Sequence, residues 1–438
     1  MTVDMLEAKE RFQKNLEEHF HTTAKKERAS IHNQAWDRFL QLGLPTKEME
    51  VYRCIKLRSL YQQSFALAEP ATCTLQDLTP YFLPECKGAV LVFVNGFFHP
   101  TLSQTAAIPD RIVISSFQEA QRTYGTFIHH HLTTSLKEES DPLTAANAAL
   151  NDGGAFLYLP PKSVVTTPIQ LLFVVNAETA IHLFPRLTVF CGAHSQLSLV
   201  STQAVLAGTR YCLNQCTDMI IEEGAHAALY QIHDENPPEA WHFDAFRATL
   251  KQHSTCKVFA MTNGCAAMRS DYRVVLKGEN ADVQLHGIWM LQKKREAHTN
   301  VLVDHQAPRC HSMQTYKGVL NDSGRSSFEG KIFVGKLAQH TDAFQLNRNL
   351  LLSGRASAHS KPNLEIFADD VKASHGATVG PPDDEQLFYL KTRGCTSSDA
   401  KKILVQGFCQ EVIDHIPSLS MKGFIAQKIK KHAIHGLD

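Results

Sequence analysis

Hydrophobic and polar residues alternate in many short segments through the middle of the chain, and this alternation predicts strand after strand from residue 155 to 380. Glycine, asparagine and proline separate the segments. Several segments begin about thirty residues apart with no helical pattern between them, which favours a parallel β-helix whose coils bury inward side chains on one another. A β-sandwich is the alternative that periodicity leaves open. The recurring unit is a turn and an alanine followed by alternation, seen at 192–199, 224–230 and 280–286, with similar segments beginning at Gly324 and Gly354.

Hydrophobic residues at helical spacing precede this region. One helix face is indicated by Leu6, Phe12, Leu16 and Phe20, and a second by Trp36, Phe39 and Leu40, which Gly43 and Pro45 bring to an end. From Gly88 the chain becomes rich in β-branched and aromatic residues, and residues 116–152 return to a helix-like composition. We therefore expect a helical domain at 1–87 and a mixed α/β segment at 88–154.

Helical patterns return after the strand-rich region. Asp383 is placed to cap a helix whose third position is Gln386, and Gly394 stands where a C′ residue ends it. Two further helical patterns run from about 397 to 413 and from 418 to 433. The chain is thus predicted to be mainly β, with a β-helix core at 155–380 and a C-terminal helical domain at 381–438.

Composition excludes several classes of function. The 438 residues contain 44 Lys plus Arg and 44 Asp plus Glu, so no positive field favours nucleic acid. No apolar run is long enough to cross a membrane or to serve as a signal peptide, and eleven scattered cysteines are typical of a reducing compartment, so we expect a cytoplasmic protein. No CxxC, phosphate-binding loop or GxSxG motif occurs, which argues against a permanent metal site and against ATP hydrolysis by this chain.

Three groups of residues are candidates for chemistry. The adjacent histidines 129–131 cannot all face one metal ion from a regular helix or strand. Paired carboxylates serve sugar-cleaving enzymes as general acid and base, but Asp369 and Asp370 are adjacent and would point to opposite faces of an extended strand. His375 follows them with small residues on all sides, which would leave its imidazole accessible to a ligand or partner.

The stretch that contains these residues, KPNLEIFADDVKASHGATVGPPDDEQLFYLKTRG (361–394), resembles the C-terminal signature of the SufB/SufD family of iron–sulfur cluster assembly proteins. The similarity continues through KKILVQGF (401–408), and AWDRF with GLPT (35–46) looks like the family's opening. EMEVYRCIKLRSL (48–60) lacks the family's usual Trp-Lys-Tyr-Thr run. No cysteine occurs near 347–349, where SufB-type scaffolds place one, so the similarity points to the SufD branch.

The resemblance implies a right-handed parallel β-helix flanked by N- and C-terminal helical domains. It also implies a non-catalytic scaffold that pairs with a SufB paralogue and binds the ATPase SufC, the partner that binds ATP. His375 matches the family histidine placed at the SufB interface, where it would be a ligand to a transient iron–sulfur cluster. The family often has a cysteine where this chain has Ala373, so a thiolate would come from the partner. For SufC, the resemblance implicates Leu387, Phe388, Tyr389, Arg393 and Phe408.

On this interpretation the isolated chain binds no cofactor tightly, and the sequence leaves open whether it forms a homodimer. Two other classes of function stay as alternatives. A β-helix carbohydrate-active enzyme would use Asp369 or Asp370, although aromatic residues make up only 8% of the chain, little for a sugar-binding groove. A self-contained metal-binding protein is disfavoured because the cysteines are not clustered.

Overall fold

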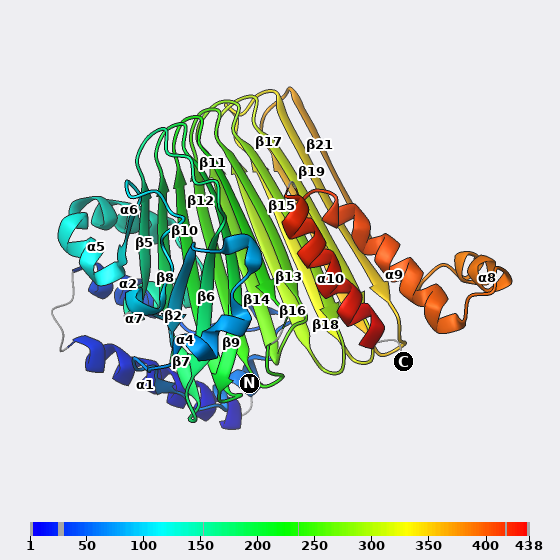
Figure 1. Ribbon diagram of the computed structural model, residues 1–438, viewed down its shortest axis with the longest axis horizontal. Helices are drawn as coiled ribbons and strands as arrows, with labels where there is room; N and C mark the ends of the chain where they lie inside the picture. The colour runs from blue at the N-terminus through cyan, green and yellow to red at the C-terminus, as the bar shows by residue number, and fades with distance from the viewer. Residues whose placement is uncertain (1–2, 25–29, 152, 235, 417, 436–438) are drawn as a thin grey trace.

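The computed structural model describes residues 3–24, 30–151, 153–234, 236–416 and 418–435, and it shows a parallel β-solenoid of about eight turns with helices at both ends (Figure 1). From β8 onward each strand pairs in parallel with the strand two positions further along the chain, and in the first coils β5 pairs with β8 and β6 with β9. Every coil therefore contributes one strand to each of two facing sheets. This pairing confirms the predicted β-helix, because a β-sandwich is built from antiparallel strands.

The two sheets are named here the first and second faces. The first face comprises β5 (Gly153–Leu159), β8 (Pro185–Cys191), β10 (Tyr211–Ile221), β12 (Trp241–Leu250), β14 (Ala267–Leu276), β16 (Glu296–His305), β18 (Arg325–Val334) and β20 (Ser357–Ile366). The second comprises β2 (Val90–Val94), β6 (Ile169–Asn176), β9 (Gln196–Ala207), β11 (His226–His233), β13 (Thr255–Thr262), β15 (Asp282–Leu291), β17 (His311–Leu320), β19 (Thr341–Leu351) and β21 (Val371–Gly380). Four short strands complete the sheet: β1 (Ala66–Leu67), β3 (Phe97–Phe98), β4 (Val113–Ser116) and β7 (Ile181–Leu183).

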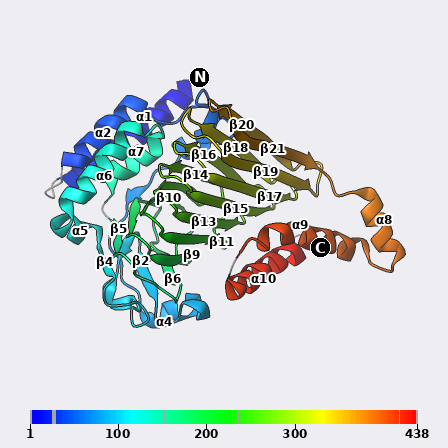
Figure 2. The same cartoon turned by 90° about the horizontal axis from the view of Figure 1, so that it is seen from above.

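Helices cover part of each face (Figure 2). Over the early coils of the first face lie α1 (Val3–Ala24), α2 (Ser30–Leu42), α6 (Gly125–Glu138) and α7 (Pro142–Leu150), while α3 (Leu57–Tyr61), α4 (Leu75–Leu78) and α5 (Phe117–Thr123) are shorter. At the other end, α9 (Ser397–Ile413) and α10 (Leu419–His435) pack on β15 and β17 of the second face. α8 (Asp384–Thr392) projects away from the solenoid.

A column of left-handed turn residues sets the period of the solenoid. His194, Gly224, His253, Asn280, Arg309 and His340 all have positive φ, and they lie 30, 29, 27, 29 and 31 residues apart. The backbone N–H of His194 donates to the Glu223 carbonyl of the next coil (2.8 Å), and that of Gly224 donates to the Gln252 carbonyl (2.9 Å). Backbone pairing of this kind continues from turn to turn, so the thirty-residue spacing is the length of one coil.

Two glycines that the sequence groups with this column lie elsewhere. Gly324 and Gly354 stand in the connections that lead from the second face back to the first, at the opposite edge of the solenoid. Neither has a positive φ; at the first of these connections the left-handed residue is Asp322. The repeat predicted from the sequence therefore combined turns from the two opposite edges of the solenoid. Turns at both edges can end in a glycine that is followed by alternating residues.

Hydrophobic side chains fill the interior in columns, one residue per coil. Leu199, Leu229, Val258 and Leu285 are paired in register and are all buried. In the N-terminal helices Phe12, Leu16, Phe20 and Phe39 are buried as expected. Leu6 is 45% and Leu40 48% exposed, because the side of each helix that packs against the protein is narrower than the arc over which its hydrophobic residues are spread.

Buried charges join the N-terminal helices to the first face. Asp271 on β14 is fully buried and accepts from the guanidinium groups of Arg247 (2.6 Å) and Arg269 (3.2 Å). Arg247 also donates to Glu139 (2.9 Å) beyond α6, and Arg269 to Asp141 (2.8 Å), the N-cap of α7. Burial raises the pKa of Asp271, but these guanidinium groups outweigh burial and hold its pKa below the ordinary value. The five residues form one cluster, here called the buried ion cluster.

Candidate functional site

His375 lies on β21, the last strand of the solenoid, and its side chain is exposed. Residues 371–380 pair in register with β19, so His375 belongs to the predicted β-helix core. His375 is opposite Gln345, which is opposite Gln314, which is opposite Leu285. Partners in a parallel sheet point to the same side, so His375 continues a column whose earlier members are buried inside the solenoid.

Beneath His375 the interior changes from hydrophobic to polar. The Gln345 side-chain amide donates to the Gln314 carbonyl oxygen (2.8 Å), and both residues are fully buried. Asn349 donates to Asn347 (2.8 Å) and accepts from the indole nitrogen of Trp289 (3.3 Å). The last coils thus hold a set of buried amides below an exposed imidazole. Sequence reasoning missed these residues, although Gln and Asn at inward positions of the alternation are a readable signal.

The last coil is also an open edge. Within the described chain, β21 pairs with β19 on one side and with no strand on the other. Ile366, Phe367 and Val379 are exposed hydrophobic residues on or beside β20 and β21. Unpaired backbone groups beside hydrophobic side chains are typical of an edge that associates with another sheet.

Asp369 and Asp370 lie in the turn between β20 and β21, where both are exposed. A carboxylate oxygen of Asp370 lies 2.8 Å from Nδ1 of His340, and the Asp370 carbonyl accepts from the His340 backbone N–H (2.6 Å). Asp370 therefore holds the turn of the preceding coil. This arrangement gives no acid and base facing one substrate, so the geometry does not favour the carbohydrate-active alternative.

Within the described part of the chain, potential metal-binding residues are not brought together. Among the described residues, no three His, Cys, Asp or Glu side chains form a group that could hold a metal ion. The histidines 129–131 lie on α6, where they point in different directions around the helix. Cys212 and Cys216 are buried, and burial raises the pKa of Cys216 to about 12. A thiol with so high a pKa is protonated at neutral pH and is a poor metal ligand.

The expected partner-binding residues fall into two groups. All nine residues of α8 are described and none is buried; Phe388 is 69% and Tyr389 58% exposed. The expected caps are present, since Asp383 accepts from two backbone N–H groups and Gly394 has a φ of 91°. Arg393 lies over the Tyr389 ring at 5.2 Å. With Leu387 half-buried, α8 is a formed helix whose aromatic side chains face solvent.

Phe408 belongs to the other group, because it anchors α9 to the solenoid. The buried Lys317 ammonium on β17 donates to the Phe408 carbonyl (2.6 Å) and to Glu411 (2.5 Å), and it lies 4.6 Å from the Phe408 ring. The hydrogen bond from Lys317 lowers the pKa of Glu411. Val405, Cys409 and Val412 pack beside this contact. The structure therefore gives Phe408 an intramolecular contact beside the partner-binding role that the resemblance implies.

Comparison with known proteins agrees with this architecture. Residues 173–408 match the family described as SUF system FeS cluster assembly, SufBD core domain, and residues 6–171 match the SufBD protein N-terminal region. The chain is 28% identical to the iron–sulfur cluster assembly protein SufD of Escherichia coli, across 90% of this chain and 91% of that protein. It is 27% identical to a SufBD family protein of Synechocystis (90% and 88% covered) and 25% identical to SufD of Bacillus subtilis (76% of each).

No helix in the described part of the chain is both long and apolar enough to span a membrane. The matched core region covers more than half of the sequence, and it spans the solenoid from within β6 to β21, all of α8 and most of α9. The fold found here and the resemblance read from residues 361–394 lead to the same assignment. The chain belongs to the SufBD family of iron–sulfur cluster assembly proteins.

Proposed function

We propose that this protein is a non-catalytic scaffold subunit that pairs with SufB through its last coil and binds the ATPase SufC through its C-terminal helices. The single observation that carries the proposal is the open edge of β21, where exposed His375 stands above buried amides. The edge supports association with a second solenoid, and the imidazole supports a role for that interface in chemistry.

Within this proposal the cluster is cargo that forms between the two subunits. His375 would supply one imidazole ligand, since it is exposed and lies on the edge strand. Ala373 is two residues away on the same side of β21 and supplies no thiol, so cysteine ligands would come from the partner. A ligand set divided between two chains supports release of the cluster when the interface moves.

The C-terminal helices connect this edge to an ATPase. β21 ends at Gly380 and α8 begins at Asp384, so a force on α8 acts within four residues of the edge strand. α9 is held on the second face by Lys317, which leaves α8 as the projecting element. We propose that SufC docks on the exposed aromatic residues of α8 and that ATP-driven closure of SufC is transmitted to β21.

The histidine is tested by His375→Ala, with Ser374→Ala as the matched control. Both residues are exposed on β21, but Ser374 belongs to the outward column. His375→Ala is expected to leave assembly with SufB and SufC unchanged and to lower iron and sulfide incorporation in anaerobic reconstitution. Ser374→Ala is expected to reconstitute normally. Full cluster yield from His375→Ala would contradict the ligand role.

The ATPase contact is tested by reversing charges on α8. The double variant Glu385→Lys and Lys391→Glu changes exposed positions without altering the Asp383 cap. We expect it to lose SufC in co-purification and to retain SufB. Lys430→Glu, an exposed change on α10, is the control and is expected to retain both partners. Unchanged recovery of SufC with the double variant would place the ATPase contact elsewhere.

A further inference from the structure

His375 is the exposed end of a column of side chains whose next member, Gln345 on β19, is fully buried. The Gln345 amide nitrogen donates to the side-chain carbonyl oxygen of Gln314 (2.8 Å). The Gln345 side-chain oxygen, Oε1, is also buried, and among the described residues it has no hydrogen-bond partner. A buried acceptor that lacks a donor costs free energy, so this oxygen requires an explanation.

The Gln345 amide is held from two sides. Its nitrogen donates to Gln314 on β17, and Gly330 on β18 of the first face lies against the same nitrogen, where an added Cβ would collide with it. The oxygen is at the other end of the planar amide and therefore points away from Gln314. On that side the next strand is β21, which carries His375 opposite Gln345. The open acceptor is thus fixed below the imidazole.

His375 is the side-chain donor that β21 can supply to this oxygen. Gln345 is opposite His375 itself, at the spacing of neighbouring strands, about 4.8 Å. Alternate residues of β21 share the interior side with His375, and none of them has a side-chain N–H or O–H group. They are Val371, Ala373, Ala377 and Val379. The imidazole therefore carries the polar hydrogen that the strand places nearest to Oε1.

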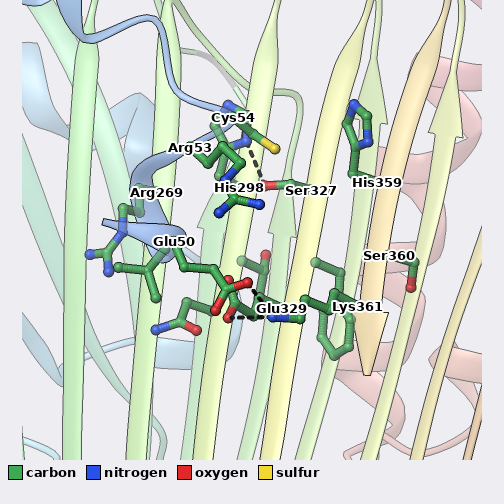
Figure 3. Close-up of a pocket in the computed structure, with 14 residues that line it drawn as sticks. Glu50, Arg53, Cys54, Arg269, His298, Ser327, Glu329, His359, Ser360 and Lys361 are labelled. Carbon is green, nitrogen blue, oxygen red and sulfur yellow. Dashed lines mark hydrogen bonds and ion pairs between the residues drawn. The ribbon is translucent and has the colours of Figure 1, made fainter. Parts of the chain in front are cut away.

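Histidines elsewhere in the solenoid bond to the residue opposite them in register. In the first-face pocket beside Cys54, His298 is opposite Ser327, and its Nδ1 lies 2.8 Å from the Ser327 hydroxyl (Figure 3). On the second face, Nδ1 of His311 lies 2.8 Å from a carboxylate oxygen of Asp282, its register partner. The spacing of the coils therefore lets an imidazole reach the side chain of the neighbouring strand, and it does so through Nδ1 in both cases.

We propose that Gln345 is a positioning residue for His375, whose Nδ1–H donates to Gln345 Oε1 and leaves Nε2 as the nitrogen that binds the cluster. A histidine ligand almost always donates its second ring nitrogen to an acceptor, which fixes the ring orientation and strengthens the ligand. Exposed side chains change rotamer within nanoseconds, so the ring reaches the buried oxygen without a change in the backbone. The inference rests on the ligand role proposed for His375 and adds the residue that orients it.

The tautomer of the His375 ring reports this bond directly. The full chain is prepared with ¹⁵N-labelled histidine, and two-bond ¹H–¹⁵N correlations at about pH 8.5 show which ring nitrogen carries the proton. Comparison with His375→Ala identifies the His375 signals among those of the 23 histidines. We expect the Nδ1–H tautomer to dominate in the native chain, because the hydrogen bond of one ring nitrogen selects the tautomer.

Substitutions locate the acceptor. Gln345→Leu removes it and should shift the ratio of the two tautomers about fivefold toward Nε2–H, as expected from the net contribution of one hydrogen bond. Gln345→Glu keeps an acceptor oxygen and should keep the native tautomer. Gly330→Ala leaves the amide chemically intact but displaces it, and should act like Gln345→Leu. The matched control is Gln231→Leu, which removes a buried amide on β11 far along the solenoid and should leave the tautomer unchanged.

A native chain in which Nε2–H dominates, or a ratio that Gln345→Leu leaves unchanged or shifts toward Nδ1–H, would overturn the proposal. An equal shift in Gln231→Leu would also refute it, since the effect would then be one of general packing. If Gln345→Leu does not fold, Gly330→Ala and Gln345→Glu give the same decision.

The tautomer is measured without a cluster, so this inference and the ligand role fail separately. Full cluster yield from His375→Ala would remove the ligand role whatever the tautomer. A low yield from His375→Ala with an unchanged tautomer in Gln345→Leu would remove only the positioning role. When both hold, Gln345→Leu should lower iron and sulfide incorporation less than His375→Ala does, because the imidazole is still present.

Discussion

Neutralising Asp271 is the most direct test of how the helical domain is held on the solenoid. The substitution Asp271→Asn keeps the size of the side chain and removes its charge. In the native protein this carboxylate is fully buried, accepts from Arg247 and Arg269, and also accepts from the Asn300 amide (2.5 Å). Its replacement removes the negative charge between the guanidinium groups and puts an amide NH2, which only donates, where one carboxylate oxygen accepted.

The size of the effect follows from these contacts. Removing one partner of a buried ion pair costs about 3–5 kcal/mol, because the remaining charge stays buried without compensation. The lower end applies here, since Arg247 keeps Glu139 and Arg269 keeps Asp141. The unfolding entropy of a 438-residue chain is roughly 0.9 kcal/mol/K, so about 3 kcal/mol corresponds to a decrease of roughly 3 °C in Tm.

Thermal unfolding followed by circular dichroism measures this decrease. The matched control is Glu365→Gln, which neutralises a carboxylate paired with Lys331 (2.6 Å) where both side chains are 40% exposed. An exposed pair contributes about 0–1 kcal/mol, so the control should change Tm by less than about 1 °C. If Asp271→Asn changed Tm by no more than Glu365→Gln does, burial would not distinguish the two pairs and the reasoning would be refuted.

Two further predictions concern the second face. Burial lowers the pKa of His286 to about 3 from its ordinary 6.5, so protonation of this imidazole opposes the docking of α9 and α10. The free energy of docking is therefore fully present above pH 6.5 and should decrease by about 2 kcal/mol at pH 5. His286→Phe should remove that dependence in hydrogen exchange of the two helices, and an unchanged pH dependence would exclude His286 as its cause. Gly318→Ala would place a methyl group against the Trp289 indole nitrogen and the Asn349 carbonyl oxygen, breaking their hydrogen bond. We expect Gly318→Ala to lower the free energy of unfolding by roughly 1–3 kcal/mol and to change the tryptophan emission spectrum. The control Gly423→Ala has open space at its Cβ and should not destabilise the protein. Equal stability of the two variants would contradict this packing.

The elements that sequence patterns predicted well are those stabilised by local chemistry. Asp383 and Gly394 cap α8 as expected, because capping involves backbone groups within one turn of helix. Alternation of hydrophobic and polar residues likewise predicted the strands, because successive side chains of a strand point inward and outward in turn. The exposure of His375 was predicted correctly from the small residues around it, but its position on an edge strand is known only from the pairing with β19.

Features that depend on pairing between coils were not readable in advance. Leu387, Phe388, Tyr389 and Phe408 look alike as hydrophobic helical residues, yet the first three lie on the projecting helix α8 and Phe408 is fastened to Lys317. The pocket at Cys54 unites a segment near residue 50 with strands that begin more than two hundred residues later. The grouping of Gly324 with Gly224 failed for the same reason, since the edge on which a turn lies is a property of the whole coil.

The amino-acid sequence by itself determined the β-helix, its capped C-terminal helices and the family, because alternation, capping and a contiguous signature are all local properties of the chain. Only the tertiary structure decided that His375 lies above buried Gln345, that Asp271 is shared by guanidinium groups from two coils, and that Glu50 meets Lys361. These contacts join residues from different coils or domains. Their geometry follows from strand register, which backbone hydrogen bonds and the packing of the whole interior establish together.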